Sequence, residues 1–317
     1  MARIGRIQTA LPPHRHTQEE LRAVAERIFG PTRFLSIFEN AGVQTRYLAR
    51  PAASYIEESG FGARNRAAVE ASLALAQQAC RGLTDGIATL VYVTTTAVAT
   101  PSIDARLGLD PGVRRVPIFG VGCSGGAAAL ARAAELPGPA LVISSEVCSL
   151  TFLPNDRSPT NVVAAALFGD GAAAVRVGER ETGPRIVKTA TRLFPNSLDV
   201  MGWDVTDAGL KLVLSQEVPR MVREHLAPMV RAFVEDAPIR HWILHPGGPR
   251  VLEAYAESLG LSDEQLEPSR SFLARHGNLS SASVLFILSE VKAQPGDFGL
   301  VASVGPGFAG DLVLLQW

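Results

Sequence analysis

Cysteine is scarce in this sequence, and neither sign of charge is in excess. The 317 residues include three cysteines, Cys80, Cys123 and Cys148, whose odd number and wide spacing exclude a disulfide framework and a zinc site of closely spaced cysteines. The formal net charge of -1 provides no basic field that would attract nucleic acid or an anionic membrane. We therefore expect free thiols in a reducing cytoplasm and no nucleic-acid partner.

Long apolar runs are also missing. The first residues, MARIGRIQTALPPHRH, lack the apolar core of a signal peptide, and no uninterrupted apolar run approaches the length that spans a membrane. We therefore expect a cytoplasmic protein without a membrane partner. What is present is a globular composition with 47% hydrophobic residues, sufficient for one large layered domain or two smaller ones.

Strand-like and helix-like segments alternate along the chain, which predicts α/β layers around a largely parallel, buried sheet. The first helix has the clearest start, because Thr17 is followed three residues later by Glu20 in the pattern of a capping box. Helices are predicted at 17–30, 64–81, 124–136, 216–234 and 249–258. Strands are predicted at 87–96, 113–122, 140–147, 172–178, 185–194, 239–247, 299–305 and 311–317.

The two halves of the chain share a pattern. VPIFGVGCSGGAAALARA is matched by RSFLARHGNLSSASVLFIL, in which a glycine and one polar residue precede small residues that open an apolar helix. FGDGAAAVRV is matched by GPGFAGDLVLLQW, a glycine turn followed by a closing strand. We predict two duplicated halves, 1–180 and 181–317, which would bring Cys123 and Asn278 to related positions at their interface; small-residue helix starts are also common in unrelated α/β proteins.

Three polar residues stand where predicted elements begin or end. Cys123 lies between a predicted buried strand and a helix, whose unpaired N–H groups and positive dipole end favour a thiolate. His245 ends a predicted strand and Asn278 begins a predicted helix. Each also has a structural explanation: a small buried cysteine, a satisfied histidine and an N-cap. Together, a thiol, an imidazole and an amide suit acyl-thioester chemistry, so the sequence predicts a cysteine enzyme.

Several motifs then carry a family resemblance. ALFGDGAAAV at 165–174, HPGGP at 245–249 and GNLSSASVLFILSE at 277–290 resemble type III polyketide synthases, the chalcone synthase-like group of the thiolase superfamily. SSEVCSLTF and GPGF fit the same pattern, and MGWDVTDAGLKLVLS resembles the bacterial branch. The resemblance runs in order across essentially the whole chain. It implies an α/β fold, the thiolase-type αβαβα layered sandwich of two duplicated halves.

The resemblance also implies a reaction. Cys123 would take the starter acyl group from an acyl-CoA and hold the growing chain, and His245 would stabilise its thiolate as an ion pair. His245 and Asn278 would hydrogen-bond the malonyl-CoA thioester oxygen, where charge develops on loss of CO₂. Repeated decarboxylative Claisen condensations would end in cyclisation to an aromatic or pyrone polyketide. No metal or redox cofactor is implied, because the thioester itself acidifies the neighbouring carbon.

Further residues are assigned by motif match. Phe168 would be a gatekeeper between the coenzyme A tunnel and the cavity, and Arg46 would hold coenzyme A phosphates. Thr100 would cross the interface of a homodimer into the partner's cavity. The remaining candidates for the cavity wall are Thr95, Thr96, Glu146, Cys148, Thr151, Leu212 and Ser280. Those for close backbone approach to the substrate are Gly247, Gly248, Gly305, Pro306 and Gly307. Ser303 stands where the resemblance leads us to expect a glycine near the oxyanion hole.

Two other functions remain open at this level. One is a ketosynthase III-like enzyme that performs a single condensation, or an acyltransferase that never extends. The other is a catalytically impaired dimer partner, which would require an unreactive Cys123.

Overall fold

The computed structural model describes residues 1–57 and 59–317, and its centre is a nine-stranded sheet in the order β11-β12-β13-β8-β1-β7-β6-β4-β5. The strands are β1 (Arg3–Ala10), β4 (Thr89–Val93), β5 (Arg114–Ile118), β6 (Ala140–Val147), β7 (Asp170–Gly178), β8 (Arg185–Leu193), β11 (Ile239–Leu244), β12 (Phe298–Gly305) and β13 (Ala309–Gln316). All eight predicted strands are confirmed, although several are shorter than predicted, and β1 was not predicted.

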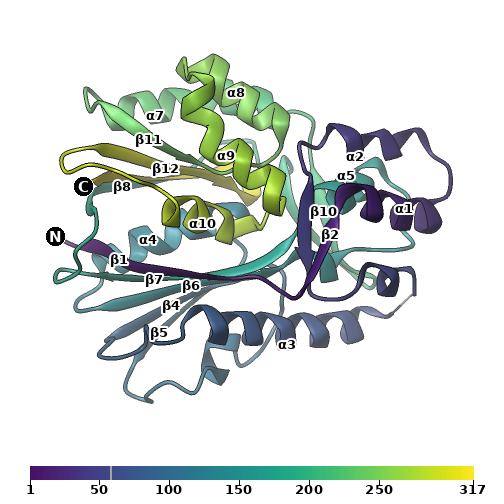
Figure 1. Ribbon diagram of the computed structural model, residues 1–317, viewed down its shortest axis with the longest axis horizontal. Helices are drawn as coiled ribbons and strands as arrows, with labels where there is room; N and C mark the ends of the chain where they lie inside the picture. The colour runs from purple at the N-terminus through teal and green to yellow at the C-terminus, as the bar shows by residue number, and fades with distance from the viewer. Residues whose placement is uncertain (58) are drawn as a thin grey trace.

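The sheet has matching pairings in its two halves. β4 and β6 are parallel and β7 closes them antiparallel, while β11 and β12 are parallel and β13 closes them in the same way. β1 and β8, the first strands of the two halves, meet in the middle. The first half lies below the second in Figure 1. This arrangement agrees with the repeat seen in the sequence.

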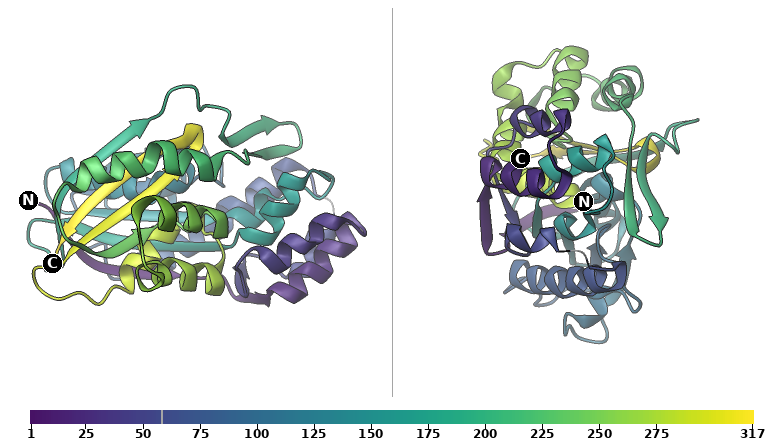
Figure 2. Two further views of the ribbon diagram at one scale, coloured as in Figure 1. Left: turned by 90° about the horizontal axis from the view of Figure 1, so that it is seen from above. Right: turned by 90° about the vertical axis from the view of Figure 1, so that its right-hand side faces the viewer.

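Helices lie in three layers around the two halves of the sheet. α4 (Gly125–Glu135) and α10 (Ser283–Ser289) lie between the halves and contact strands of both (Figure 1). α3 (Phe61–Ala79) covers the outer face of the first half, and α8 (Pro249–Leu259) and α9 (Asp263–His276) lie outside the second, with α7 (Ala227–Val234) (Figures 1 and 2). The predicted αβαβα order of layers is confirmed.

Small residues at the start of α4 explain how two helices fit between the sheets. A Cβ on Gly126 would lie 2.3 Å from the carbonyl oxygen of Ser281, and a Cβ on Gly125 would lie 2.6 Å from a methyl group of Val93. Larger side chains would therefore force α4 away from the start of α10 and from β4. The close packing brings the turn before α4 next to the turn before α10, and these turns carry Cys123 and Asn278.

The remaining elements gather at one end of the molecule, where α1, α5 and the β9–β10 hairpin lie (Figures 1 and 2). Thr17 caps α1 and forms the predicted capping box with Glu20. These elements are α1 (Gln18–Phe29), α2 (Ile37–Asn40), α5 (Pro159–Leu167), β2 (His14–Thr17), β3 (Thr45–Leu48), β9 (Met201–Thr206) and β10 (Gly209–Leu214). Short 3₁₀ turns are η1 (Arg33–Ser36), η2 (Ala52–Ile56), η3 (Ile103–Arg106), η4 (Gly122–Ser124), η5 (Cys148–Thr151), η7 (Ser280–Ala282) and η8 (Pro306–Phe308).

Three predictions about elements need correction. The strand before Cys123 is not buried: β5 is an edge strand with exposed residues, and Phe119 beyond it is 55% exposed. The sheet is not largely parallel as predicted, because five of the eight strand pairings in the described nine-stranded sheet are antiparallel. The predicted helix at 216–234 consists of α6 (Val218–Met221), a π-helical turn at 222–226, and α7. Within the described residues, no helix is long and apolar enough to cross a membrane.

Candidate active site

A cavity of about 560 Å³ lies beside the turns that precede α4 and α10. Its volume is within the range of small-molecule sites. Cys123, His245 and Asn278 all line it, and they come from three separate segments: η4, the residue after β11, and the residues after α9. The structure therefore brings together the three residues that the sequence singled out.

Cys123 is buried in the middle of η4, two residues before α4 begins at Gly125. Its sulfur lies 3.7 Å from the hydroxyl oxygen of Ser280. Burial raises the pKa of Cys123 to about 12 and the charge of Glu146 adds to this, while hydrogen bonds from Ser280 and the Asn278 side chain act in the opposite direction. The position of Cys123 before a helix predicted that the thiolate would be favoured over the thiol. Burial outweighs that effect when the thiol has no cation beside it, so the pKa is raised.

His245 lies at the end of β11, where its backbone N–H donates to the carbonyl oxygen of Ala302 at 2.9 Å. The side chain is 1% exposed, and both ring nitrogens lack a hydrogen-bond partner among the described residues. Burial lowers the pKa of His245 to about 3, so the ring is neutral at pH 7 unless an anion forms next to it. A buried ring without polar partners that faces a cavity is suited to a substrate or to the Cys123 sulfur that lines the same cavity.

Asn278 is held by its backbone and by its own side-chain oxygen. Its N–H donates to the carbonyl oxygen of Leu167, and its carbonyl oxygen accepts from the N–H of Gly169. The side-chain Oδ1 accepts from the N–H of Ser280 at 2.7 Å, which leaves the Nδ2 donors for the cavity. Ser280 has a φ of 49°, in the left-handed region that non-glycine residues rarely adopt. Such strain is often found at functional sites.

A buried carboxyl group supports the wall behind the sulfur. Glu146 accepts hydrogen bonds from the N–H of Thr95 at 2.9 Å, from the hydroxyl of Thr96 at 2.8 Å, and from Ser281. Burial raises the pKa of Glu146. Thr95 lines the cavity as predicted, whereas Thr96 and Glu146 lie behind it, which corrects their predicted place in the wall. The hydrogen bond from Thr95 to Glu146 thereby holds this part of the cavity wall in place.

Phe168 stands between two cavities. It lines the 560 Å³ cavity and also an apolar pocket of about 70 Å³ next to α1, as do Cys148, Leu212 and Trp203. Phe168 follows the last residue of α5 and forms a bridge with Asn278. A side chain at this junction is placed to control passage between the two spaces, and its predicted position beside a coenzyme A tunnel stays a prediction.

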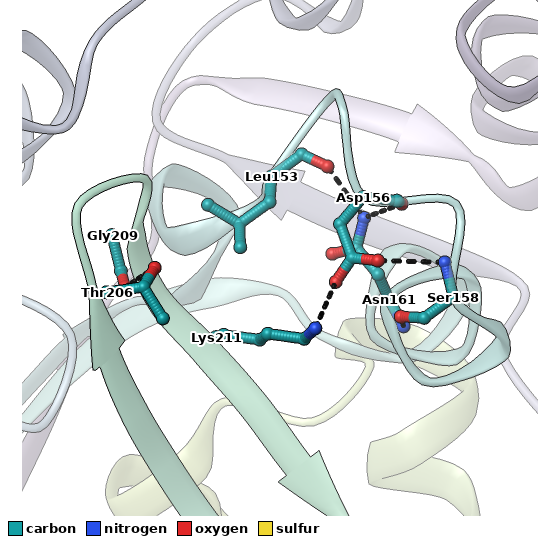
Figure 3. A network of polar contacts seen from close by, with 7 residues as sticks. All are labelled: Leu153, Asp156, Ser158, Asn161, Thr206, Gly209 and Lys211. Carbon is teal, nitrogen blue, oxygen red and sulfur yellow. Dashed lines mark hydrogen bonds and ion pairs between the residues drawn. The ribbon is translucent and has the colours of Figure 1, made fainter.

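The β9–β10 hairpin forms the outer wall of the cavity through Met201, Trp203, Leu212 and their neighbours. An ion pair attaches the hairpin to the loop that precedes α5 (Figure 3). In it, Nζ of Lys211 lies 3.8 Å from Oδ2 of Asp156. That loop is itself fixed, because Asn161 donates to the carbonyl oxygen of Asp156 at 2.8 Å (Figure 3). The hairpin is thus connected to the helix that carries Phe168.

The glycines of the last predicted motif serve the packing of protein segments and not of a ligand. A Cβ on Gly305 would lie 2.2 Å from the carbonyl oxygen of Val121 and 2.7 Å from the hydroxyl of Ser124. Gly305 and Gly307 do not line the cavity, whereas Pro306 does. Ser303 is buried in β12, and its hydroxyl donates to the carbonyl oxygen of Ser124 at 3.5 Å. β12 therefore supports the turn that carries the nucleophile candidate.

Arg46 is not where a coenzyme A phosphate could reach it. The side chain is 2% exposed, and Nη1 donates to the carbonyl oxygens of Ala165 and Phe168, each at 2.7 Å. Nη2 donates to Oε1 of Gln18 at 2.9 Å. The predicted phosphate-binding role of Arg46 is wrong in this structure: the guanidinium braces the end of α5, where Phe168 begins.

The other predicted residues divide between the cavity and its surroundings. Those that line the cavity are Cys148, Leu212, Ser280, Gly247 and Gly248. Thr151 lines only the small pocket, and Thr100 is exposed and lines neither space in the single chain. The sequence reasoning missed much of the apolar wall: Phe34, Ile37, Val163, Met201, Trp203, Val213, Leu214 and Pro219. The TDAG turn between two apolar runs was the available signal for the hairpin.

Comparisons with known proteins agree with these observations. Residues 51–181 match the N-terminal domain of chalcone and stilbene synthases, and residues 185–316 match the C-terminal domain. The chain is 40% identical to a 1,3,6,8-tetrahydroxynaphthalene synthase of Streptomyces peucetius subsp. caesius, with 99% of this chain and 93% of that protein covered. It is 35% identical to a putative chalcone synthase of Bacillus subtilis, with 100% and 99% covered.

Solved structures give the same result. The crystal structure of 1,3,6,8-tetrahydroxynaphthalene synthase from Streptomyces coelicolor A3(2), described as a bacterial type III polyketide synthase, superposes with a TM-score of 0.91 at 30% identity. The superposition covers 99% of both chains.

Proposed function

We propose that this chain, which belongs to the chalcone and stilbene synthase family of type III polyketide synthases, condenses malonyl-CoA units onto an acyl starter held on Cys123. The chain has the thiolase-like fold of that family and is a condensing enzyme of the acyltransferase type. The substrates, the residue roles and the product are our proposal.

One observation supports the proposal above all others. A buried thiol, an imidazole whose two nitrogens lack partners in the described chain, and an amide whose side chain hydrogen-bonds the thiol line one cavity. A structural cysteine or histidine needs no such arrangement, whereas acyl transfer through a thioester needs a nucleophile, a proton acceptor and donors for an oxyanion.

The first step is loading of the starter. The proton of Cys123 passes to His245, and the thiolate attacks the carbonyl carbon of the acyl-CoA. The tetrahedral intermediate expels the thiolate of coenzyme A, which takes the proton from His245, so the acyl group remains on Cys123. Because burial opposes each charge alone, thiolate and imidazolium form together and each stabilises the other.

The second step is decarboxylative condensation. Malonyl-CoA loses CO₂, and the electron pair of the broken bond forms an enolate on the thioester. The N–H groups of His245 and Asn278 hydrogen-bond the enolate oxygen, and a donor of this kind lowers the barrier by about 3 kcal/mol. The enolate carbon then attacks the Cys123 thioester and releases its thiolate, which leaves a chain longer by two carbons on coenzyme A. Return of that chain to Cys123 allows another cycle.

Cyclisation of the extended chain would give an aromatic or pyrone polyketide. The name of the 40% identical relative favours a polyhydroxylated aromatic product. Phe168 would set how far the chain extends toward the small pocket, since it lines both spaces.

We also propose a homodimer in which Thr100 approaches the partner's cavity. The open edge strand β5 and the exposed apolar side chains of Val98, 43% exposed, and Phe119, 55% exposed, support a covered face there. Light scattering coupled to size exclusion would give twice the chain mass; a monomer at micromolar concentration would contradict the dimer.

Product analysis tests the proposed function. The protein is incubated with malonyl-CoA alone and with a panel of acyl-CoA starters, and the products are read by mass spectrometry for the wild type and for Cys123→Ala. We expect polyketide products from the wild type only. A single extension would favour the ketosynthase III-like reaction, transfer without extension an acyltransferase, and no reaction with any starter an impaired dimer partner; each of these outcomes contradicts our proposal.

A further inference from the structure

A pair of opposite charges lies buried near the catalytic cavity. Arg46 in β3 is 2% exposed, and Asp170, the first residue of β7, is 0% exposed. Burial lowers the pKa of Arg46 to about 9 and raises the pKa of Asp170 to about 6, while the charge of each partly offsets the shift of the other. Both are therefore charged at pH 7. Because buried charges contribute little net stability, stability alone does not explain the pair.

Arg46 holds the backbone of Phe168, whose side chain lies between the two cavities. Nη1 of Arg46 donates to the carbonyl oxygens of Ala165 and Phe168, each at 2.7 Å. Nη2 donates to Oε1 of Gln18 at 2.9 Å, and Nε2 of Gln18 donates to the carbonyl oxygen of Ala166 at 2.8 Å. The last carbonyls of a helix have no partner within it, so these contacts complete the end of α5. Phe168 therefore cannot shift without breaking a buried, charge-assisted hydrogen bond.

The same side chain packs against the turn that carries Asn278. A Cβ on Gly277, the residue before it, would lie 2.8 Å from Cδ of Arg46. Gly277 has a φ of 70°, a conformation that favours glycine. Asn278 is in turn paired with the end of α5, because its N–H donates to the carbonyl oxygen of Leu167 at 2.8 Å. Arg46 thus contacts two segments, one with Phe168 and one with Asn278, and fixes how they lie relative to each other.

Asp170 holds the other side of this junction. Its Oδ1 accepts from the N–H of Ser149 at 2.8 Å, and its Oδ2 accepts from the N–H of Ala49 at 2.7 Å. Ser149 follows Cys148, which lines both cavities as Phe168 does. The carboxylate also compensates the charge of Arg46, so the guanidinium stays ionised while it donates to the carbonyls.

We propose that Arg46 is a positioning residue for decarboxylation, which sets the place of Asn278 and of Phe168 at the substrate, with Asp170 as its counter-ion. This inference rests on the proposed function, because it takes Asn278 as a donor to the enolate oxygen. Arg46 does not line the catalytic cavity, so it acts through these two residues and not on the reacting atoms. A small displacement of the donor weakens the hydrogen bond to the developing charge and slows the reaction.

A double-variant cycle on decarboxylation tests the assignment. Release of CO₂ from malonyl-CoA is measured for the wild type, Arg46→Met, Asn278→Ala and the variant with both changes, and for Arg46→Lys, which keeps the charge. Arg176→Met is the matched control, because Nη1 of Arg176 also donates to two backbone carbonyls, yet this residue of β7 lines neither cavity. Thermal unfolding and the alkylation rate of Cys123 are measured for each variant.

We expect kcat for CO₂ release to fall about tenfold in Arg46→Met, with the KM of malonyl-CoA and the alkylation rate of Cys123 within about threefold of the wild type. Arg46→Lys should recover part of the loss. In the Asn278→Ala background, Arg46→Met should cause no further loss in kcat, because the donor that it positions is already absent. Arg176→Met should lower the melting temperature and leave all three kinetic values unchanged.

Two results would overturn the inference. One is a wild-type kcat for CO₂ release in Arg46→Met, and the other is the same loss in both backgrounds, which would assign Arg46 a general structural role. If Arg46→Met does not fold, Gln18→Met takes its place in the cycle: it removes the acceptor of Nη2 and keeps both charges, and a loss of about threefold is expected. A wild-type rate in Gln18→Met then overturns the inference. Absence of CO₂ release by the wild type would contradict the proposed function and the inference with it, whereas the other results leave that function intact.

Discussion

Replacing His245 with alanine should strongly reduce the reactivity of the Cys123 thiol. Burial raises the pKa of Cys123 to about 12, and without an imidazole to accept the proton this value applies to the thiol alone. At pH 7 the thiolate fraction would then be about 10⁻⁵, against about 3% for an ordinary cysteine. Alkylation of Cys123 in His245→Ala should therefore be about a thousandfold slower than that of an exposed thiol.

The assay is the rate of carbamidomethylation of Cys123 by iodoacetamide between pH 6 and 10, followed by peptide mass spectrometry so that Cys80 and Cys148 are counted separately. In the wild type, the ion pair with His245 should make the rate nearly independent of pH around neutrality. In His245→Ala, the rate should rise about tenfold per pH unit, because the raised thiol pKa lies above the whole range. His14→Ala, a histidine outside both cavities, should behave as the wild type. A wild-type rate and profile in His245→Ala would refute the reasoning.

Three further predictions follow from the geometry of the site. Asn278→Ala should slow decarboxylation of malonyl-CoA about a hundredfold while alkylation of the nucleophile stays within a few-fold of the wild type; a loss of both would indicate a structural role. Phe168→Ala should join the two pockets and shift turnover toward longer acyl-CoA starters, and an unchanged starter profile would contradict the gate. Gly305→Ala should destabilise the fold by about 3 kcal/mol in thermal unfolding, because its Cβ would lie 2.2 Å from a carbonyl oxygen, whereas Gly62→Ala inside α3 should not. Equal melting temperatures for the two glycine variants would show that the close approach is not essential.

Local chemistry made much of the fold predictable. Thr17 and Glu20 mark the start of α1, and the alternation of apolar runs gives eight of the nine strands of the described sheet in their correct order along the chain; the central strand β1 was not predicted. The run of small residues after Cys123 indicated close helix packing, which the contact between Gly126 and Ser281 explains. The division of the chain at residue 180 stays a prediction.

Tertiary placement was harder to predict. β5 was taken for a buried strand because its residues are apolar enough, yet strand order puts it at the open edge. Arg46 was assigned to coenzyme A by motif match to the family, but its burial beneath α5 cannot be read from a sequence. Arg250 was not predicted as a cavity residue, because only the folded chain shows that the first turn of α8 reaches the cavity.

In the candidate site, too, the local sequence signals were predictable, whereas the placement of residues in space was not. Cys123, His245 and Asn278 each had a structural explanation when considered alone, and only the family resemblance and the folded chain bring them to one cavity. The segment MGWDVTDAGLKLVLS was matched to the family, but Leu212 was predicted as a wall residue and Trp203 was not. Residue roles at the site remain predictions until they are measured.

The most direct test of the central claim is the mass of the intact protein after brief exposure to malonyl-CoA labelled in its free carboxyl group, with release of labelled CO₂ measured in the same sample. We predict labelled CO₂ and an acyl adduct that peptide mapping places on Cys123, with the adduct lost in Cys123→Ala and kept in Cys148→Ala. Absence of an adduct on Cys123 in the wild type, or an adduct that survives in Cys123→Ala, would contradict the account.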